Sequence, residues 1–575
     1  MKYKLIENDK IKNINFNDIN LIDKILLNRG IKNPQHFLNL SNEDLNSYKL
    51  LSNIDIAVKC LLSHIENNDK ILILTDPDCD GQCSASILYQ YLKEIKMDIN
   101  LNYILQNGKE HGLNNKLEIP EDIKLLIIPD AGTNDFEKCK ELKDKGIDII
   151  ILDHHEFNKQ NNYAIIVNPL LDNYPNKQLS GGAVVFKFLQ ALDENLWEDK
   201  ANKYLDLVAL SIIGDSMDLR EPETKRLVDL GLQNINNKAF QAIINKQNYS
   251  MNGNVTIQNV QFYVVPLLNA TIRSGEVEDK ENLFEAFCQI DKFFDYKKRG
   301  EIEIIQEDIY TRVARIATNL RAKQNREIDK GLEIINKDIE KYNRNNNKFL
   351  FANASELDTN FIGLTAMKLA SQYSKPCILI HPSKNNPDYF TGSMRNFNGS
   401  PIENLKDFIT NTKLFDFVQG HQFAAGLGIK KDNIKKAIDK INELLKDIDF
   451  DKIYKVDFIF NADDINLNFI ASVDKLKKMW GNNIEEPQIL IKNIKINTND
   501  IELMGKEQET LKFTLNEDGI ICIMFKCGSN DSIIKIKEEE PLGKWIELEA
   551  VVKVGMNVFN SISSPQCTIL DYNII

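Results

Sequence analysis

Several features that assign a chain to a class at once are missing here. The 575 residues contain no run of about 18 apolar residues, so we expect no transmembrane helix and no membrane association. The first residues lack the long apolar segment of a signal peptide. The nine cysteines are scattered and form no Cys-x-x-Cys pair, which is typical of a reducing compartment. We therefore predict a cytoplasmic protein.

The chain also lacks an excess of basic residues. Lysine and arginine number 71 against 84 aspartate and glutamate, giving a formal net charge of −13. This balance argues only weakly against a nucleic-acid partner, because an acidic protein can still carry one basic groove. The length allows roughly three or four domains.

What is present begins with an alternation of strands and helices between residues 70 and 170. Helical stretches at 84–96 and 136–145 lie between short apolar runs. This order predicts an α/β domain with a parallel sheet and crossover helices. The expected strands are residues 71–75, 101–105, 124–129, 148–152 and 164–167.

The remaining segments have other patterns. Helical spacing dominates from about 183 to 245, and a charged segment without proline, residues 296–342, predicts a long linking helix. A second α/β region follows at 349–446, with expected strands at 349–352 and 377–381 around a helix at 363–373. Short strands broken by Asn, Asp and Gly from 452 to 575 indicate an all-β domain, for which a small barrel is the expected form.

The most informative motif follows the first of these strands. Asp76, Asp78 and Asp80 alternate there and precede Gly81. Carboxylates in this pattern suit hard divalent cations, and an α/β sheet binds ligands at the carboxyl ends of its strands. The alternative, a helix-loop-helix calcium site, needs an acidic residue at its twelfth position, which is Ile87 here.

Three more polar clusters end apolar runs. They are Asp130 followed by Ala-Gly, the Asp-His-His sequence containing His154 and His155, and Asp215 after Gly214. A single Asp in such a place is usually a helix cap or a turn residue. Four such clusters in one domain are a stronger indication of a metal site, because carboxylates gathered together repel each other unless cations neutralise them. Two metal ions would do so and would activate a water.

The order Asp-x-Asp-x-Asp-Gly, Asp-x-Gly, Asp-His-His and Gly-Asp resembles that of the DHH phosphoesterases. Within that family the chain is most similar to the RecJ-like single-stranded-DNA-specific exonucleases. The similarity continues over most of the chain, in segments at 25–34, 179–187, 204–210, 266–273, 392–395, 420–426, 557–560 and 566–571.

The resemblance implies a domain order. We expect an N-terminal segment at 1–50, a DHH catalytic domain at 51–290 and a linking helix at 291–347. A smaller α/β DHH-associated domain at 348–450 and an OB-like nucleic-acid-binding domain at 451–575 would follow.

The resemblance also implies roles for individual residues. Two Mn²⁺ or Mg²⁺ ions would be the cofactors, with Asp130 bridging them and His155 beside the phosphate. Asp76 would be a direct or an outer ligand. The metal set is Asp76, Asp78, Asp80, Asp130, His154 and Asp215; the catalytic set is Asp78, Asp130, His154 and His155; the substrate-binding set is Lys109, His111, Arg273, Ser393, Arg395 and His421.

Some positions depart from the family pattern. The loop at 106–113 has no arginine, so Lys109 or His111 would replace it with a weaker grip on a 5′-phosphate. The usual Gly-Gly-His is Gln419-Gly420-His421 here, and Asn269-Ala-Thr-Ile-Arg273 replaces Asn-Ala-Ala-Gly-Arg. These changes suggest a divergent, phage-borne member.

The implied function is metal-dependent hydrolysis of single-stranded DNA, from 5′ to 3′, releasing mononucleotides in recombination and repair. We expect a monomer whose protein partners would be a helicase or a single-strand-binding protein. Phe525, Trp545 and Phe559 are candidates for base stacking, although core packing is the commoner role of such residues.

Two alternatives stay open. One is a DHH phosphodiesterase of short oligonucleotides or cyclic dinucleotides, although such relatives are generally shorter. The other is a non-catalytic scaffold that binds DNA, although such relatives tend to lose metal ligands, and every principal ligand position here holds a competent residue.

Overall fold

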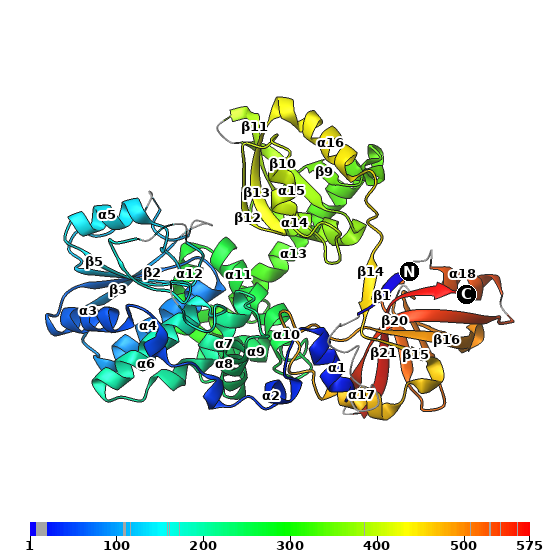
Figure 1. Cartoon of the computed structure of the whole chain (residues 1–575), viewed down its shortest axis with the longest axis horizontal. Coiled ribbons are helices and arrows are strands. Elements are labelled where there is room, and N and C mark those ends of the chain that lie inside the picture. The colour runs from blue at the N-terminus through cyan, green and yellow to red at the C-terminus, as the bar shows by residue number, and fades with distance from the viewer. Residues whose placement is uncertain are drawn as a thin grey trace.

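A computed structural model shows three folded parts, of which one long helix joins the first to the second and an extended segment leads from the second to the third (Figure 1). It describes residues 1–6, 20–106, 111–114, 117–157, 159, 161–171, 173–383, 386–506, 508–527, 531–540, 542–559 and 562–575. Across these residues, every helix is too short or too polar to cross a membrane.

The first part is built on the predicted parallel sheet, with strand order β3-β2-β4-β5-β6. Strands β2 and β4 are buried along their whole length because helices cover both faces, which explains their unbroken apolar sequences. All five expected strands form within one residue of their predicted bounds. They are β2 (Ile71–Thr75), β3 (Leu101–Leu105), β4 (Leu125–Pro129), β5 (Asp148–Leu152) and β6 (Ile165–Val167).

Three helices that pack on one another, α4, α6 and α7, position the polar residues at the sheet edge. Helix α4 (Cys79–Ile95) leaves β2 directly, and α6 (Gly181–Leu196) starts at a Ser180 cap. The other helices of this part are α3 (Ile54–Glu66), α5 (Phe136–Asp144), α7 (Leu205–Gly214), α8 (Pro222–Gln233), α9 (Lys238–Gln247), α10 (Ile257–Asn259), α11 (Val265–Ser274) and α12 (Val277–Phe287), with a π-helical turn at Val260–Val264.

The linking segment differs from the prediction. A β-hairpin of β7 (Phe293–Lys297) and β8 (Ile304–Asp308) comes first, and helix α13 (Ile309–Lys341) follows it. The prediction that the helix starts near residue 296 was therefore wrong, because the hairpin precedes the helix and α13 begins at Ile309. Gly300, with φ of 87°, lies between the two strands.

Helix α13 leads into a second α/β part with a five-stranded mixed sheet of order β12-β13-β11-β10-β9. The predicted strand-helix-strand unit is β9, α14 and β10. The elements are β9 (Leu350–Asn353), α14 (Ile362–Tyr373), β10 (Cys377–Ser383), β11 (Asn386–Arg395), α15 (Leu405–Thr410), β12 (Phe417–His421), β13 (Ala424–Lys430) and α16 (Lys431–Leu445).

The C-terminal part holds a seven-stranded sheet of order β15-β16-β20-β21-β19-β18-β17, in which most neighbours are antiparallel. Two short helices that the sequence analysis did not predict, α17 (Leu467–Asp474) and α18 (Ser532–Glu539), accompany it. The strands are β15 (Phe458–Asn461), β16 (Ile489–Asn497), β17 (Glu502–Met504), β18 (Thr510–Thr514), β19 (Ile521–Met524), β20 (Trp545–Phe559) and β21 (Ile562–Ile574).

The N-terminal segment packs on this C-terminal part. Strand β1 (Lys2–Leu5) pairs in parallel with β14 (Ile453–Val456), and Figure 1 shows both chain ends on the same side of the molecule. After α1 (Leu21–Asn28), the Arg29 guanidinium forms a buried two-bond ion pair with Asp457. A short helix, α2 (Pro34–Leu38), then leads to the first part.

Candidate active site

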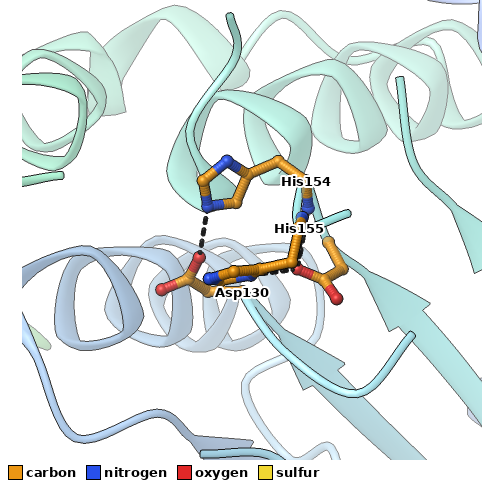
Figure 2. Close-up of side chains that lie close together, drawn as sticks. Asp130, His154 and His155 are labelled. Carbon is orange, nitrogen blue, oxygen red and sulfur yellow. Dashed lines mark hydrogen bonds and ion pairs between the residues drawn. The ribbon is translucent and has the colours of Figure 1, made fainter. Parts of the chain in front are cut away.

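The polar motifs meet at the carboxyl edge of the first sheet. His154, which follows β5, directs its Nε2 atom at Asp130 Oδ1, 3.2 Å away, as Figure 2 shows. The same nitrogen lies 3.7 Å from Asp80 Oδ2 and 3.6 Å from Asp215 Oδ2. Three carboxylates from three different segments therefore surround one imidazole nitrogen.

Asp80 is held by a dense set of donors. The backbone N–H groups of Gly181 and Gly182, at the start of α6, donate to its two oxygens at 2.8 and 2.9 Å. Ser211 Oγ on α7 donates at 2.5 Å and Ser84 Oγ on α4 at 3.0 Å. The N-terminus of α6 carries a partial positive charge that favours this carboxylate.

The other two aspartates of the first motif have different partners. Asp78 is the N-cap of α4, and its Oδ1 accepts from the Gly81 N–H at 3.0 Å. Both oxygens of Asp76 are occupied, one by His111 Nδ1 at 2.5 Å and the other by the Gly112 N–H at 3.2 Å. This geometry favours the role of Asp76 as an outer residue that positions His111.

The His155 ring lies next to that of His154, with ring centroids 4.5 Å apart, and beside Asp130 (Figure 2). One ligand atom from each of His155, His154, Asp130 and Asp153 lies within 4.8 Å of the others. His155 Nδ1 lies 2.8 Å from Asp153 Oδ1, while Thr133 donates to Oδ2 of the same carboxylate through both its N–H and its hydroxyl. Burial would lower the pKa of His155, but the hydrogen bond and charge of Asp153 raise it to about 9. His155 is therefore a cation at neutral pH, half exposed beside the cluster.

Two positions at the start of α6 require glycine because neighbouring side chains leave no room for a Cβ atom. A Cβ atom on Gly181 would lie 2.4 Å from Asp130 Oδ1, and one on Gly182 would lie 2.4 Å from Ser211 Oγ. The Ser-Gly-Gly sequence at the start of α6 thus lets this helix end pack directly against two of the site's polar groups.

The electrostatics of the cluster call for a cation. Burial, and then the charge of Asp80, raises the pKa of Asp130 well above its ordinary value. Burial, Asp76 and Asp80 raise the pKa of Asp78, and burial with Asp80 and Asp78 raises that of Asp215 to about 8. Burial lowers the pKa of His154, so the imidazole that the three carboxylates surround does not supply the missing positive charge.

The donor set fits divalent metal ions. Asp130 Oδ1 and His154 Nε2 are buried, and neither makes a hydrogen bond to another described residue. Atoms of Asp80, His154 and Asp215 lie within 4.8 Å of one another, as do atoms of Asp76, Asp78 and His111. Carboxylate oxygens with one imidazole are ligands that Mn²⁺ accepts and Mg²⁺ mostly shares.

The second α/β part brings basic residues toward each other. The side chain of Arg395, at the end of β11, lies against Gly363 at the start of α14, where a Cβ would be 2.5 Å from its Nη2. Burial, and then the nearby Arg273 guanidinium of α11, lowers the pKa of Arg395. Among the described residues, neither arginine has a carboxylate within ion-pair distance, so the two charges suit an anion.

The predicted substrate residues are only partly brought together. Ser393 lies two residues before Arg395 on β11, near the same glycine. His421 is exposed at the end of β12, and Lys109 lies outside the described residues. Phe525 and Trp545, for which core packing was the commoner expectation, are 54 % and 69 % exposed, and the Phe559 side chain is outside the described set.

Sequence reasoning missed the residues that support the site. Asp153 belongs to the Asp-His-His motif, yet its part in orienting His155 was not predicted. Ser211 also escaped notice, although a lone hydroxyl within the apolar stretch before Asp215 was a usable signal.

Comparison with family models shows two matches. Residues 70–212 match the DHH family, N-terminal domain, and residues 456–571 match the RecJ OB domain.

Full-length relatives extend the similarity. A Bacillus subtilis protein provisionally named SPbeta prophage-derived single-strand DNA-specific exonuclease YorK is 36 % identical over 100 % of this chain and 98 % of its own length. The single-stranded-DNA-specific exonuclease RecJ of the same organism is 24 % identical over 98 % of this chain and 70 % of its own length.

Solved structures show the same fold. RecJ from Thermus thermophilus in complex with Mn²⁺ superposes with a TM-score of 0.72 at 18 % identity, covering 96 % of this chain and 76 % of that one. The Mg²⁺ complex superposes with a TM-score of 0.67 at 16 % identity, covering 96 % and 74 %.

Proposed function

The chain belongs to the DHH-family exonucleases that include YorK and RecJ, and we propose on that premise that it hydrolyses single-stranded DNA from one end. The relatives carry the names of single-strand DNA-specific exonucleases, and both matched family models fall on the parts that such an activity needs.

One observation carries the proposal. Asp80, Asp130 and Asp215 converge on His154 Nε2 within 3.7 Å, and among the described residues only the half-exposed His155 imidazolium stands beside these three carboxylates. A non-catalytic scaffold would have no reason to keep this costly set of buried charges. The intact cluster therefore favours catalysis over the scaffold alternative.

Within this proposal, Asp78, Asp80, Asp130, His154 and Asp215 hold two Mn²⁺ or Mg²⁺ ions. Such ions, when bound, supply an activated water and a clamp on the phosphoryl oxygens. The His155 imidazolium, oriented by Asp153, would offset charge on the phosphate during cleavage. Asp76 would position His111, whose side chain is more than half exposed.

Arg273 and Arg395 would grip the terminal phosphate. The guanidinium group binds phosphate through a fork of donors, and these two groups approach each other without a carboxylate partner among the described residues. We propose a 5′ to 3′ direction with release of mononucleotides, and a role in recombination and repair. Ser393 and His421 would complete the contact from the second part.

The C-terminal part would hold the incoming strand. Exposed Phe525 and Trp545 offer faces on which bases can stack in any sequence. We infer that the protein acts in the cytoplasm as a monomer, next to a helicase or single-strand-binding protein that supplies the strand.

The test compares three substrates with the full chain and Mn²⁺: a long single strand, the matching duplex and a dinucleotide. Rapid cleavage of the long single strand alone is expected. Preference for the dinucleotide would favour the short-substrate phosphodiesterase, and no cleavage of any substrate with metal bound would overturn the proposal.

A further inference from the structure

A second cluster of metal-ligating side chains lies at the opposite edge of the first sheet. Cys60 and His64 are one turn apart on α3, and Asp148 is the first residue of β5, whose other end carries the catalytic histidines. One ligand atom from each of these three residues lies within 4.8 Å of the others. His64 Nε2 is 3.1 Å from Asp148 Oδ2.

The surroundings orient these groups as a metal site requires. The other ring nitrogen of His64, Nδ1, lies 2.8 Å from Asp69 Oδ2, as in the carboxylate–histidine pairs that fix metal-bound imidazoles. Lys143 Nζ contacts Asp148 Oδ1 at 2.5 Å, which leaves Oδ2 facing His64. His64 and Asp148 therefore each have an outer partner, and their two inner atoms face one another.

The cluster is also accessible. Of the nine cysteines, eight are buried and only Cys60 is partly exposed. Burial and the charge of Asp148 raise the pKa of the Cys60 thiol to about 11, so this cysteine is not a nucleophile. A cation placed between the thiol and the carboxylate would reverse that balance and displace the thiol proton.

We propose that Cys60, His64 and Asp148 bind one zinc ion at this edge, with Asp69 as the outer carboxylate that positions His64. One thiolate, one imidazole and one carboxylate are ordinary zinc ligands, and three protein ligands leave a fourth tetrahedral position for water. The ion would join α3 to β5 and would take no part in DNA cleavage.

The test is a Co²⁺ titration of the full chain in excess Mg²⁺, which occupies the oxygen- and nitrogen-donor catalytic cluster, followed by near-ultraviolet absorption. A thiolate bound to Co²⁺ gives an intense charge-transfer band, whereas the catalytic cluster, which holds only oxygen and nitrogen donors, gives none. We expect a band that saturates at one equivalent per chain and disappears when Zn²⁺ is added. The same Zn²⁺ should raise the melting temperature.

Matched variants assign the band. Cys60→Ser and His64→Gln should abolish it and the Zn²⁺-dependent rise in melting temperature. Cys139→Ser, at a buried cysteine of the same part, and Asp130→Asn, at the catalytic cluster, should keep both. If Cys60→Ser fails to fold, as judged by circular dichroism, His64→Gln decides. A wild-type chain without the band, or a band that survives both variants, would overturn the proposal.

Discussion

Asp130 occupies an unusual backbone conformation, with φ of 69°, and its carboxylate lies directly against the start of α6. Apart from glycine, Asp and Asn are among the residues that tolerate this left-handed region best. The strained turn at the end of β4 aims the carboxylate at His154, so conformation and charge are separable properties of this residue.

Asp130→Asn should separate them. Asn keeps the left-handed turn and the shape, but it removes the charge that would bridge two ions. We expect the rate of DNA cleavage to fall on the order of 100-fold or more. Loss of a residue that only supports a metal ligand costs up to about 100-fold, and loss of a ligand should cost at least as much. Rates with Mn²⁺ and circular dichroism check this, and wild-type cleavage by a folded variant would contradict the bridging role.

The position of Gly181 should be equally sensitive. In Gly181→Ala, the new Cβ would lie 2.4 Å from Asp130 Oδ1 and displace it, which should lower the cleavage rate on the order of 100-fold. Gly555→Ala is the control, because the nearest side-chain atom to its Cβ would be 3.5 Å away. Equal rates for both variants would show that the helix end does not position Asp130.

The metal-free protein should lose stability as pH rises. Burial with the charges of Asp80 and Asp78 raises the pKa of Asp215 from 3.8 to about 8. Between these values the folded state binds more protons than the unfolded state at this group, so the free energy of unfolding falls with increasing pH. Melting temperatures in a chelator should fall more steeply from about pH 5 to about pH 8 for the wild type than for Asp215→Asn. Parallel curves would contradict the raised pKa.

The sequence predicted the clustered polar residues better than the groups that support them. Asp80, Asp130, His154 and Asp215 each follow a recognisable motif, and the structure brings them together. The donors to Asp80 come from α4, α6 and α7, and their meeting depends on helix packing that no local pattern encodes.

Among the elements, the strands of the first sheet were predictable because short apolar runs rich in Ile and Leu are long enough for strands but too short for helices. The hairpin of β7 and β8 was mistaken for helix because the charged segment that starts near residue 296 was interpreted as having helical spacing and contains no proline. Gly300 marks the connection between the strands, and β8 begins after it, at Ile304.

The first residue of strand β20, Trp545, is 69 % exposed, so its indole is accessible for a base of single-stranded DNA to stack on. Trp545→Ala should weaken binding of single-stranded DNA by about 1–3 kcal/mol, the range for one lost base stack. Affinity is best measured in the Asp130→Asn background, so that the strand stays intact. Tyr249→Ala, at an aromatic residue of the first part that is 95 % exposed, is the control and should change little. Equal affinities for both would exclude Trp545 from the DNA path.

At the scale of the whole molecule, the N-terminal segment ties distant parts together. Strand β1 pairs with β14, and the Arg29 guanidinium, 7 % exposed, contacts a fully buried Asp457 at 2.7 and 3.0 Å. Residues 1–50 were expected to form a separate N-terminal segment. In the structure, β1 and the residues around Arg29 pack on the C-terminal part.

Removing one partner of this buried pair should be costly. Arg29→Met should lower the free energy of unfolding by about 3–5 kcal/mol, because Asp457 would keep an uncompensated buried charge. The exposed ion pair of Lys2 with Asp449 provides the control, since Lys2→Met should lower the free energy of unfolding far less. Denaturant unfolding measures both, and recovery in the double variant Arg29→Met/Asp457→Leu would identify the buried charge as the cause. A loss of unfolding free energy in Arg29→Met as small as that in Lys2→Met would contradict a stabilising role for the buried ion pair.

The most direct test of the central claim follows both ends of one long single strand. The full chain and Mn²⁺ are incubated with DNA labelled at either its 5′ or its 3′ end, beside the Asp130→Asn variant. The account predicts immediate release of a labelled mononucleotide from the 5′ end, a 3′ label that stays on a shrinking strand, and release slowed by at least about 100-fold in the variant. Release first from the 3′ end would contradict the proposed direction, and cleavage unaffected by Asp130→Asn would contradict the metal site itself.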